Sequence, residues 1–332
     1  MFGSRKEIDF LSIGDITVDA FIKIKDADIH CEYKKEKCEL CFNFGGKVPY
    51  ESVTEIPGSG NGPNVSVGIS RLGFSSALIS ATGEDDNGKK CIETLKREKV
   101  WTENVTIQKD KNTNYHFVLW YGVERTILTK HNDFTYRLPK NLPVPGWLYL
   151  SSIGDSSSIF YKEITSFLEK NPGVRLAFQP GTFQLKMETE KLRNIYKRTD
   201  VFICNKQEAE RLLQNNTKEI KKLLWGVKTL GPKVVVITDG IYGAYAYDGE
   251  TNWFMPTYPQ EPFERTGAGD AFSSAFIGAL MMGKTIEEAL MWGPINSASV
   301  VKYAGAQKGL LTRKQIEEHL KKAPESYHPR KI

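Results

Sequence analysis

The second half of the chain alternates short apolar segments with amphipathic ones. From Trp147 onward, the apolar segments are WLYLSSI, VRLAFQP, DVFICN and KVVVITDG. Strands that are separated by helices pair in parallel through right-handed crossovers, which places helices on both faces of the sheet. Ligands of such sheets collect at the carboxyl ends of the strands. We therefore expect an α/β fold with a mostly parallel central sheet, and functional side chains just after its strands.

The segment at residues 263–283, FERTGAGDAFSSAFIGALMMG, predicts an anion site at the start of an apolar helix. Gly267, Ala268 and Gly269 leave backbone N–H groups free to face an anion, and the helix dipole adds positive potential. Asp270 follows, and its carboxylate would repel an anion. It is better suited to accept a proton from a hydroxyl that attacks the anion, as phosphoryl transfer requires. A tight turn followed by an N-terminal Asp has the same pattern.

The sequence TGAGDAFSSAF resembles the C-terminal signature of the PfkB, or ribokinase-like, family of sugar and nucleoside kinases. The resemblance implies that Asp270 is the catalytic base and that the backbone of Gly267, Ala268 and Gly269 forms the anion hole. It also implies ATP and Mg²⁺ as cofactors.

The same resemblance covers essentially the whole chain and implies one ribokinase-like domain over residues 1–332. The implied fold is a three-layer α/β/α arrangement with a small β-sheet lid, formed by about residues 22–56 and 111–130. Such a lid closes over the sugar, excludes water and often contributes to a homodimer contact.

Two segments near the N-terminus resemble the family's sugar-binding motifs. In GDITVD, Asp19 stands where the family binds sugar hydroxyls, and a carboxylate can accept from two adjacent hydroxyls at once. Asp15 either assists it or caps the end of a strand. The glycine-rich segment at residues 57–73 contains Gly60, whose backbone can approach a sugar closely, and Asn64, whose amide offers a donor and an acceptor.

Later motifs resemble the nucleotide-binding part of the family. The residues that the resemblance assigns to ATP are Asn205, Thr238, Gly240, Gly243 and Asn296. Glu208, in NKQE, matches a carboxylate that places Mg²⁺ through water, and Mg²⁺ does keep several waters in proteins. The alternative for Glu208 is a first-turn carboxylate that the helix dipole favours.

Two residues before the TGAGD motif depart from the family pattern. Glu264 and Arg265 stand where family members usually have Asp and a small hydroxyl residue. Binding of a monovalent cation near this loop, as in many relatives, is therefore an open expectation. Arg265 either neutralises phosphate charge or pairs with Glu264 on the surface.

Residues 113–130 alternate aromatic and β-branched side chains with polar ones, which predicts a hairpin in the second half of the lid. Arg125 is expected near its tip. The aromatic side chains either stack on a substrate or pack in a dimer interface; these are Tyr115, Phe117, Trp120 and Tyr121.

The cysteines present a second possible site. Five cysteines, an odd number without a secretory segment, argue against a disulfide framework. The residues His30, Cys31, Cys38 and Cys41 are close in sequence, and their ligand types suit a structural Zn²⁺ ion in the lid. Free thiols are the alternative.

Charge and hydropathy limit the partners. The net charge of +5 comes from 45 basic and 40 acidic residues in short clusters, which is typical of a solvated surface rather than a nucleic-acid-binding one. No apolar run reaches the roughly 18 residues of a membrane span, and the N-terminus does not resemble a signal peptide. We therefore expect a cytoplasmic enzyme with no nucleic-acid or membrane partner.

The resemblance implies a function as an ATP-dependent sugar kinase. The implied reaction transfers the γ-phosphate to a primary hydroxyl of a ribose- or fructose-type sugar, with Asp270 as base. Two alternatives stay open at this point. One is a nucleoside kinase of the same fold, and the other is a nucleotide-binding protein without turnover.

Overall fold

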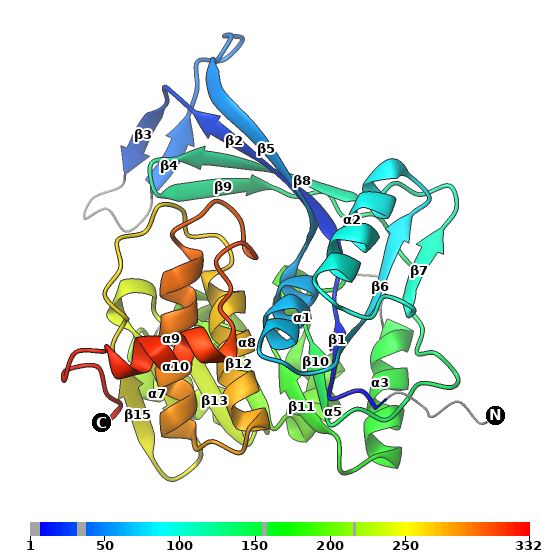
Figure 1. The fold of residues 1–332 in the computed structure, drawn as a ribbon, viewed down its shortest axis with the longest axis vertical. Helices are drawn as coiled ribbons and strands as arrows, with labels where there is room; N and C mark the ends of the chain where they lie inside the picture. The colour runs from blue at the N-terminus through cyan, green and yellow to red at the C-terminus, as the bar shows by residue number, and fades with distance from the viewer. Residues whose placement is uncertain (1–6, 32–37, 155–157, 215–216) are drawn as a thin grey trace.

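The computed structural model describes residues 7–31, 38–154, 158–214 and 217–332 (Figure 1). A ten-stranded sheet forms the body of the molecule, and a four-stranded sheet stands at one edge of this body (Figure 1). Within the described part of the chain, no helix is both long and apolar enough to cross a membrane.

The large sheet is mostly parallel, as expected. Its strand order is β16-β15-β14-β13-β12-β11-β10-β1-β6-β7, and all neighbouring pairs from β13 to β7 are parallel. The last three strands add an antiparallel edge. The strands are β1 (Phe10–Ile13), β6 (Ser76–Gly83), β7 (Val105–Gln108), β10 (Trp147–Leu150), β11 (Arg175–Phe178), β12 (Val201–Asn205), β13 (Val234–Thr238), β14 (Ala244–Tyr247), β15 (Asn252–Met255) and β16 (Arg330–Lys331).

Helices cover both faces of this sheet, because its central strands are apolar on both sides. In β13, Val235 and Ile237 belong to one buried cluster and Val236 to the other. The first cluster packs against α3 (Ser158–Lys170), α5 (Arg193–Arg198), α6 (Lys206–Leu213) and α7 (Ile220–Thr229). The second packs against α1 (Asn61–Arg71), α8 (Ala268–Met281), α9 (Ile286–Val300) and α10 (Arg313–Lys321). This is the three-layer α/β/α arrangement.

The remaining helices are short or lie beside the lid. They are α2 (Asp86–Arg97), α4 (Thr182–Lys186) and the 3₁₀ turns Thr189–Leu192 and Gly240–Tyr242. Leu95 of α2 packs with Val18 and Leu78 in a third buried cluster, at the junction of the two sheets. This packing fixes the root of the four-stranded sheet on the body.

The four-stranded sheet has the order β5-β2-β8-β9 and is called the lid below. Its strands are β2 (Thr17–Ile24), β5 (Tyr50–Ser59), β8 (Asn114–Tyr121) and β9 (Glu124–Leu128). The hairpin predicted at residues 113–130 is therefore present. The lid begins at Thr17 rather than at residue 22, because only Gly14, Asp15 and Ile16 separate β1 of the body from β2.

The cysteine cluster does not form the zinc site considered above. A separate two-stranded sheet joins β3 (Asp28–Cys31) to β4 (Cys38–Cys41), and its antiparallel register places Cys31 directly opposite Cys38. These two residues form a disulfide, whereas Cys41 is a free thiol. Sulfur atoms that are joined in a disulfide cannot act as thiolate ligands of a metal. The described residues also contain no group of three metal-ligating side chains that would include His30. The expectation that no cysteines pair is therefore also wrong here.

Candidate active site

The anion site predicted from the sequence lies at the N-terminus of α8. Gly267 is the residue before the helix and has a φ of +79°, in the left-handed region that favours glycine. A Cβ added to Gly267 would lie 2.2 Å from the Cβ of Ala306, so the close approach of these segments also requires glycine. At Gly269, an added Cβ would meet nothing within 4 Å. The first turn of α8 therefore faces open space at Gly269, while the N–H of Ala268 donates to Arg265 O at 3.4 Å. The first N–H groups of a helix lack partners within the helix and suit an anion.

Three side-chain amides hold the carboxylate of Asp270. Asn61 donates to Oδ1 at 2.7 Å, Asn64 donates to Oδ2 at 2.8 Å and Gln179 donates to Oδ1 at 3.1 Å. Asn61 and Asn64 begin α1, and Gln179 directly follows β11. The sequence analysis missed Asn61 and Gln179, which are far from Asp270 along the chain. The three donors fix the orientation of the carboxylate without adding a positive charge.

The environment of Asp270 makes it more basic than an ordinary aspartate. The residue is only 6% exposed, and this burial raises the pKa of its carboxyl group. Hydrogen bonds from Asn64, Asn61 and Gln179 lower the pKa, while the nearby Asp19 carboxylate raises it. A raised pKa improves a carboxylate as a proton acceptor near neutral pH.

A cavity of about 190 Å³ lies in front of Asp270 and the anion site. It brings together residues from three strand or helix ends that the sequence analysis had assigned to catalysis and ATP. The predicted residues that line it are Asn205, Glu208, Thr238, Gly267, Ala268, Gly269 and Asp270. Gly240 and Gly243 lie in the turn just after Thr238 and have positive φ values of +55° and +99°.

Asn205 and Glu208 satisfy each other's backbone groups at the start of α6. The N–H of Glu208 donates to Asn205 Oδ1 at 2.8 Å, and the N–H of Asn205 donates to Glu208 Oε2 at 2.9 Å. Burial raises the pKa of Glu208, and the charge of Asp270 adds to this effect. The helix-capping alternative for Glu208 is thus realised, and the same side chain also lines the cavity.

The oxygen donors near Glu208 fit Mg²⁺ only as part of a coordination shell that water molecules and substrate phosphates complete. The cavity offers carboxylate and amide oxygens, but the described residues contain no cluster of three ligating side chains. Mg²⁺ commonly binds through one or two carboxylates, waters and substrate phosphates. The residues present therefore fit an ion that enters with a nucleotide.

Asn296 does not line the cavity that contains Asp270. Its side chain is 1% exposed and donates to Ala271 O at 2.8 Å and to Ser274 Oγ at 3.2 Å. Its oxygen accepts from the N–H of Leu311 at 2.9 Å. Asn296 therefore joins α8, α9 and the segment after it, and its assignment to ATP stays a prediction.

Two histidines accompany the predicted sugar-binding aspartates. His116 lies opposite Asp19 in the register of β2 and β8, and its Nδ1 is 3.4 Å from Asp19 Oδ1. His131 Nδ1 is 3.2 Å from Asp15 Oδ2, and Tyr136 donates to Asp15 Oδ1. The two imidazole rings are 5.1 Å apart. Asp15 therefore belongs to a polar cluster and does not merely cap a strand.

The two histidines differ in how far the sequence could have revealed them. The alternation of β8 puts His116 on the same face as Trp120, so a strand pattern could have placed it beside Asp19. His131 follows the end of β9 and has no such periodic signal.

The glycine-rich turn packs closely against this cluster. Gly60 has a φ of +118°, and a Cβ there would lie 2.2 Å from the backbone oxygen of Asp15. Asn64, one turn later, donates to Asp270 and accepts from Gln307 Nε2 at 3.0 Å. Asn64 therefore connects the glycine-rich turn and Gln307 to Asp270.

Glu264 and Arg265 do not pair with each other, which was one of the two alternatives for Arg265. Glu264 is fully buried and accepts from the N–H and Oγ1 of Thr266 at 2.8 and 2.7 Å. Its charged neighbour is Arg125 of the lid, at 3.8 Å, and not Arg265. Arg265 instead pairs with Glu124 of the lid. Both arginines line the cavity beside Asp270.

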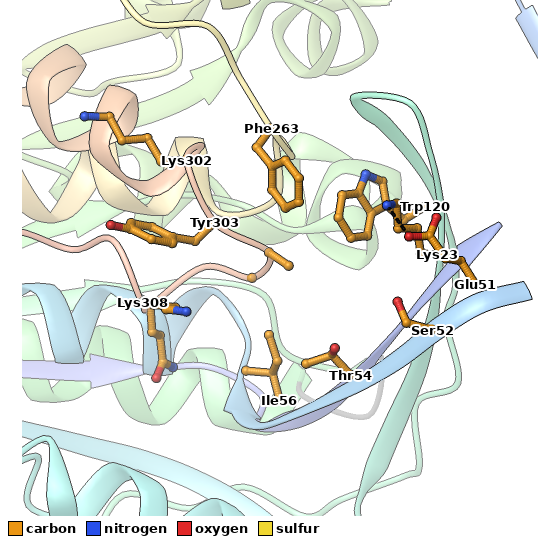
Figure 2. Close-up of a pocket in the computed structure, with 13 residues that line it drawn as sticks. Lys23, Glu51, Ser52, Thr54, Ile56, Trp120, Phe263, Lys302, Tyr303 and Lys308 are labelled. Carbon is orange, nitrogen blue, oxygen red and sulfur yellow. Dashed lines mark hydrogen bonds and ion pairs between the residues drawn. The ribbon is translucent and has the colours of Figure 1, made fainter. Parts of the chain in front are cut away.

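The aromatic residues of the lid hairpin divide between its two faces. Trp120 lies on the face toward the body, where its ring is 4.8 Å from that of Phe263 (Figure 2). Phe117 lies on the other face and is 45% exposed. A second cavity of about 560 Å³ lies under the lid beside Trp120, between lid strands and residues 302–308 (Figure 2).

The chain is similar in sequence to known carbohydrate kinases. The sequence model of the pfkB family carbohydrate kinases matches residues 22–313. The chain is 26% identical to an ATP-dependent 6-phosphofructokinase of Thermoanaerobacterium thermosaccharolyticum, over 91% of this chain and 90% of the relative. It is 28% identical to a ribokinase of Bacillus subtilis, over 83% of this chain and 92% of the relative.

Among solved structures, the fold is similar to that of a ribokinase of Arabidopsis thaliana complexed with ribose and ATP. The TM-score is 0.73 at 20% sequence identity, and the match covers 95% of this chain and 99% of the other. At this level of identity, the likeness shows the fold alone.

Proposed function

Because this chain belongs to the PfkB family of carbohydrate kinases, we propose that it transfers the γ-phosphoryl group of ATP to a primary hydroxyl of a ribose- or fructose-type sugar. The observation that carries the proposal is the position of Asp270. Its carboxylate is buried, is held by three amides, and stands beside the N-terminus of α8 at the wall of a cavity.

The residues of the site suit each part of this reaction. The Asp270 carboxylate accepts the proton of the sugar hydroxyl, whose oxygen forms a bond to the γ-phosphorus. The bond between that phosphorus and the oxygen bridging it to the β-phosphorus breaks, and ADP leaves. The N–H groups of residues 267–269 and the helix dipole stabilise the charge on the transferring group. Positioning and electrostatics supply most of the catalysis in such reactions.

The cavity wall formed by β12, β13 and α6 is the proposed site of the ATP phosphates. Thr238 offers a hydroxyl, and Gly240 and Gly243 allow the backbone to approach the nucleotide. Mg²⁺, when bound with ATP, neutralises phosphate charge. Glu208 would hold it, with Asn205 nearby, through the water molecules that Mg²⁺ retains.

The cluster around Asp15 and Asp19 is the proposed sugar site. Carboxylates accept hydrogen bonds from adjacent hydroxyls. Asp15 Oδ2 lies 3.2 Å from His131 Nδ1 but accepts no hydrogen bond from the described residues. His116 and His131 hold the two carboxylates in place. The amide of Asn64 has one N–H left after its bond to Asp270, so it can donate to a hydroxyl close to the base.

A substrate screen tests the proposal. ADP release would be measured with MgATP and a panel of ribose, fructose, other sugars and nucleosides. We expect one sugar to stimulate ADP release and to be recovered as a monophosphate. Stimulation by nucleosides alone would replace the proposed substrate class with the nucleoside alternative. If no compound stimulates turnover but MgATP raises the melting temperature, the chain binds the nucleotide without acting as a kinase.

A further inference from the structure

Three residues of the lid contact three consecutive residues that precede the anion site. The rings of Trp120 and Phe263 lie beside each other, as Figure 2 shows, and their centres are 4.8 Å apart. Glu124 pairs with Arg265, and Arg125 Nε lies 3.8 Å from Glu264 Oε1. Each segment contributes a glutamate followed by an arginine, and the glutamate of each segment pairs with the arginine of the other. We call residues 263–265 the seam.

Glu264 is buried deeply enough that its carboxylate needs a cationic partner. Its side chain is 0% exposed, and a buried carboxylate is costly unless it is paired and hydrogen-bonded. Thr266 and Gly305 donate to it, the latter at 3.4 Å. The charge of Arg125 is the one that faces it from the lid.

Arg125 has hydrogen-bonding capacity that its present contacts do not use. Its side chain is 30% exposed, and its distance to Glu264 is that of an ion pair and not of a hydrogen bond. Its buried Nε has no hydrogen-bond partner among the described residues. The same side chain lines the cavity that contains Asp270 and residues 267–269.

We propose that Arg125 is a catalytic residue that the lid delivers to the transferring phosphoryl group, and that Glu264 is its positioning residue. This proposal rests on the kinase function proposed above. A guanidinium presents N–H donors in a planar fork that matches phosphoryl oxygens. The Arg125 guanidinium donates hydrogen bonds to the oxygens of the γ-phosphoryl group and takes up no proton. The buried carboxylate of Glu264 fixes the orientation of this guanidinium.

Because Arg125 belongs to the lid, it can act only when the lid contacts the body. The backbone N–H groups of α8 belong to the body, whereas the guanidinium comes from β9. The positive environment of the phosphoryl group is complete only while the lid contacts the seam. Sugar bound against Asp19 and His116, which also belong to the lid, would favour this contact. Lid contact thereby couples sugar binding to catalysis and suppresses transfer of the phosphoryl group to water.

Steady-state kinetics of Arg125 variants test the proposal. We expect Arg125→Ala to lower kcat by about 10²- to 10³-fold, as loss of a preorganised donor to a transition state does, with little change in KM for the sugar. Arg125→Lys keeps the charge but not the fork, so it should recover part of the loss. Arg313→Ala is the matched control, because Arg313 forms an exposed ion pair with Glu317 at 2.9 Å in α10, outside the site. It should keep the wild-type kcat.

A double-mutant cycle tests the positioning role of Glu264. Glu264→Gln should lower kcat in the wild-type background and cause little further loss in Arg125→Ala, because neighbouring residues that act together are not additive. A merely structural role of Glu264 would give the same loss in both backgrounds and would overturn this part of the proposal. Circular dichroism of each variant shows whether it is folded.

The outcomes separate the two proposals. If the wild-type chain is a kinase and Arg125→Ala has the wild-type kcat, Arg125 is not catalytic and only this inference is wrong. If Arg265→Ala lowers kcat and Arg125→Ala does not, the role belongs to the neighbouring arginine, which also overturns it. A wild-type chain without turnover on any sugar or nucleoside would overturn the proposed function, and this inference with it.

Discussion

The central residue of the site, Asp270, is held by neutral donors in a buried place. An adjacent cation would lower the pKa of the carboxyl group and make it a weaker base. The amides of Asn61, Asn64 and Gln179 orient the carboxylate with a smaller effect on its basicity. Since burial raises the pKa of Asp270 despite these bonds, the environment suits proton acceptance rather than permanent ionisation.

Removal of one amide donor should change the pH dependence of turnover. The hydrogen bond from Asn61 lowers the pKa of Asp270, so Asn61→Ala should raise this pKa further. Because the base acts in its deprotonated form, the acid limb of the kcat profile should move to higher pH. Asn171→Ala is the control. The Asn171 side chain, just after α3, donates to Phe167 O of that helix at 2.8 Å. This substitution should leave the pH profile unchanged. A shift to lower pH in Asn61→Ala would contradict the account.

At Gly267, both the backbone conformation and the surrounding space disfavour a side chain. Gly267→Ala should destabilise the fold through its φ of +79° and through the overlap of its Cβ with Ala306. Gly283→Ala is a matched control, because Gly283 also has a φ of +79° but no atom within 4 Å of an added Cβ. We expect a loss of about 1–2 kcal/mol for the control and about 1–3 kcal/mol more for Gly267→Ala.

Urea unfolding measures both free energies. Equal losses in Gly267→Ala and Gly283→Ala would mean that the close approach to Ala306 does not contribute to stability.

At the scale of elements, the sequence predicted most of the body of the protein. Continuous apolar runs identified β10, β11, β12 and β13, because strands that are buried on both faces need no polar alternation. The motif around Asp270 identified the start of α8. Helix α2 begins at Asp86, because the Asp85 side chain caps it by accepting from the N–H of Gly88 at 2.8 Å.

The sequence could not predict which distant elements meet at the site. Asn61 and Gln179 are 209 and 91 residues from Asp270 along the chain, and only the packing of α1 and β11 beside α8 brings them together. The pairing of Arg125 with Glu264 likewise depends on the position of the lid. The register of β3 and β4, which puts Cys31 opposite Cys38, could not be derived from spacing alone, and the same spacing suggested zinc.

The disulfide in the β3–β4 hairpin should be dispensable for the kinase site. The residues of β3 are all exposed, so the hairpin adds little to the buried core. We expect Cys31→Ser/Cys38→Ser to keep the kcat and the melting temperature of the oxidised wild type. Mass spectrometry without reduction should show one intramolecular bond in the wild type. Metal analysis that finds one zinc per chain would contradict the disulfide assignment.

At the scale of the whole molecule, the site lies between two separately built sheets. In the proposed function, the body supplies the base, the anion site and the ATP site, while the lid supplies Asp19, His116 and Arg125. The sequence motifs identified Asp19, but they did not reveal the positions of His116 and His131 beside the two aspartates. The homodimer expected from the family resemblance stays a prediction. The outer face of the lid exposes apolar side chains that suit such a contact, among them Val53, Phe117 and Leu128.

The most direct test of the account is single-turnover phosphoryl transfer by Asp270→Asn, with MgATP and the sugar found in the screen. Asp86→Asn is the control, since Asp86 lies on the surface of α2 with 86% of its side chain exposed. We predict that Asp270→Asn binds ATP and stays folded but transfers the phosphoryl group about 10²- to 10⁴-fold more slowly, because the proton acceptor is lost. The control should match the wild type. An Asp270→Asn protein that transfers phosphate at the wild-type rate would contradict the assignment of Asp270 as the base.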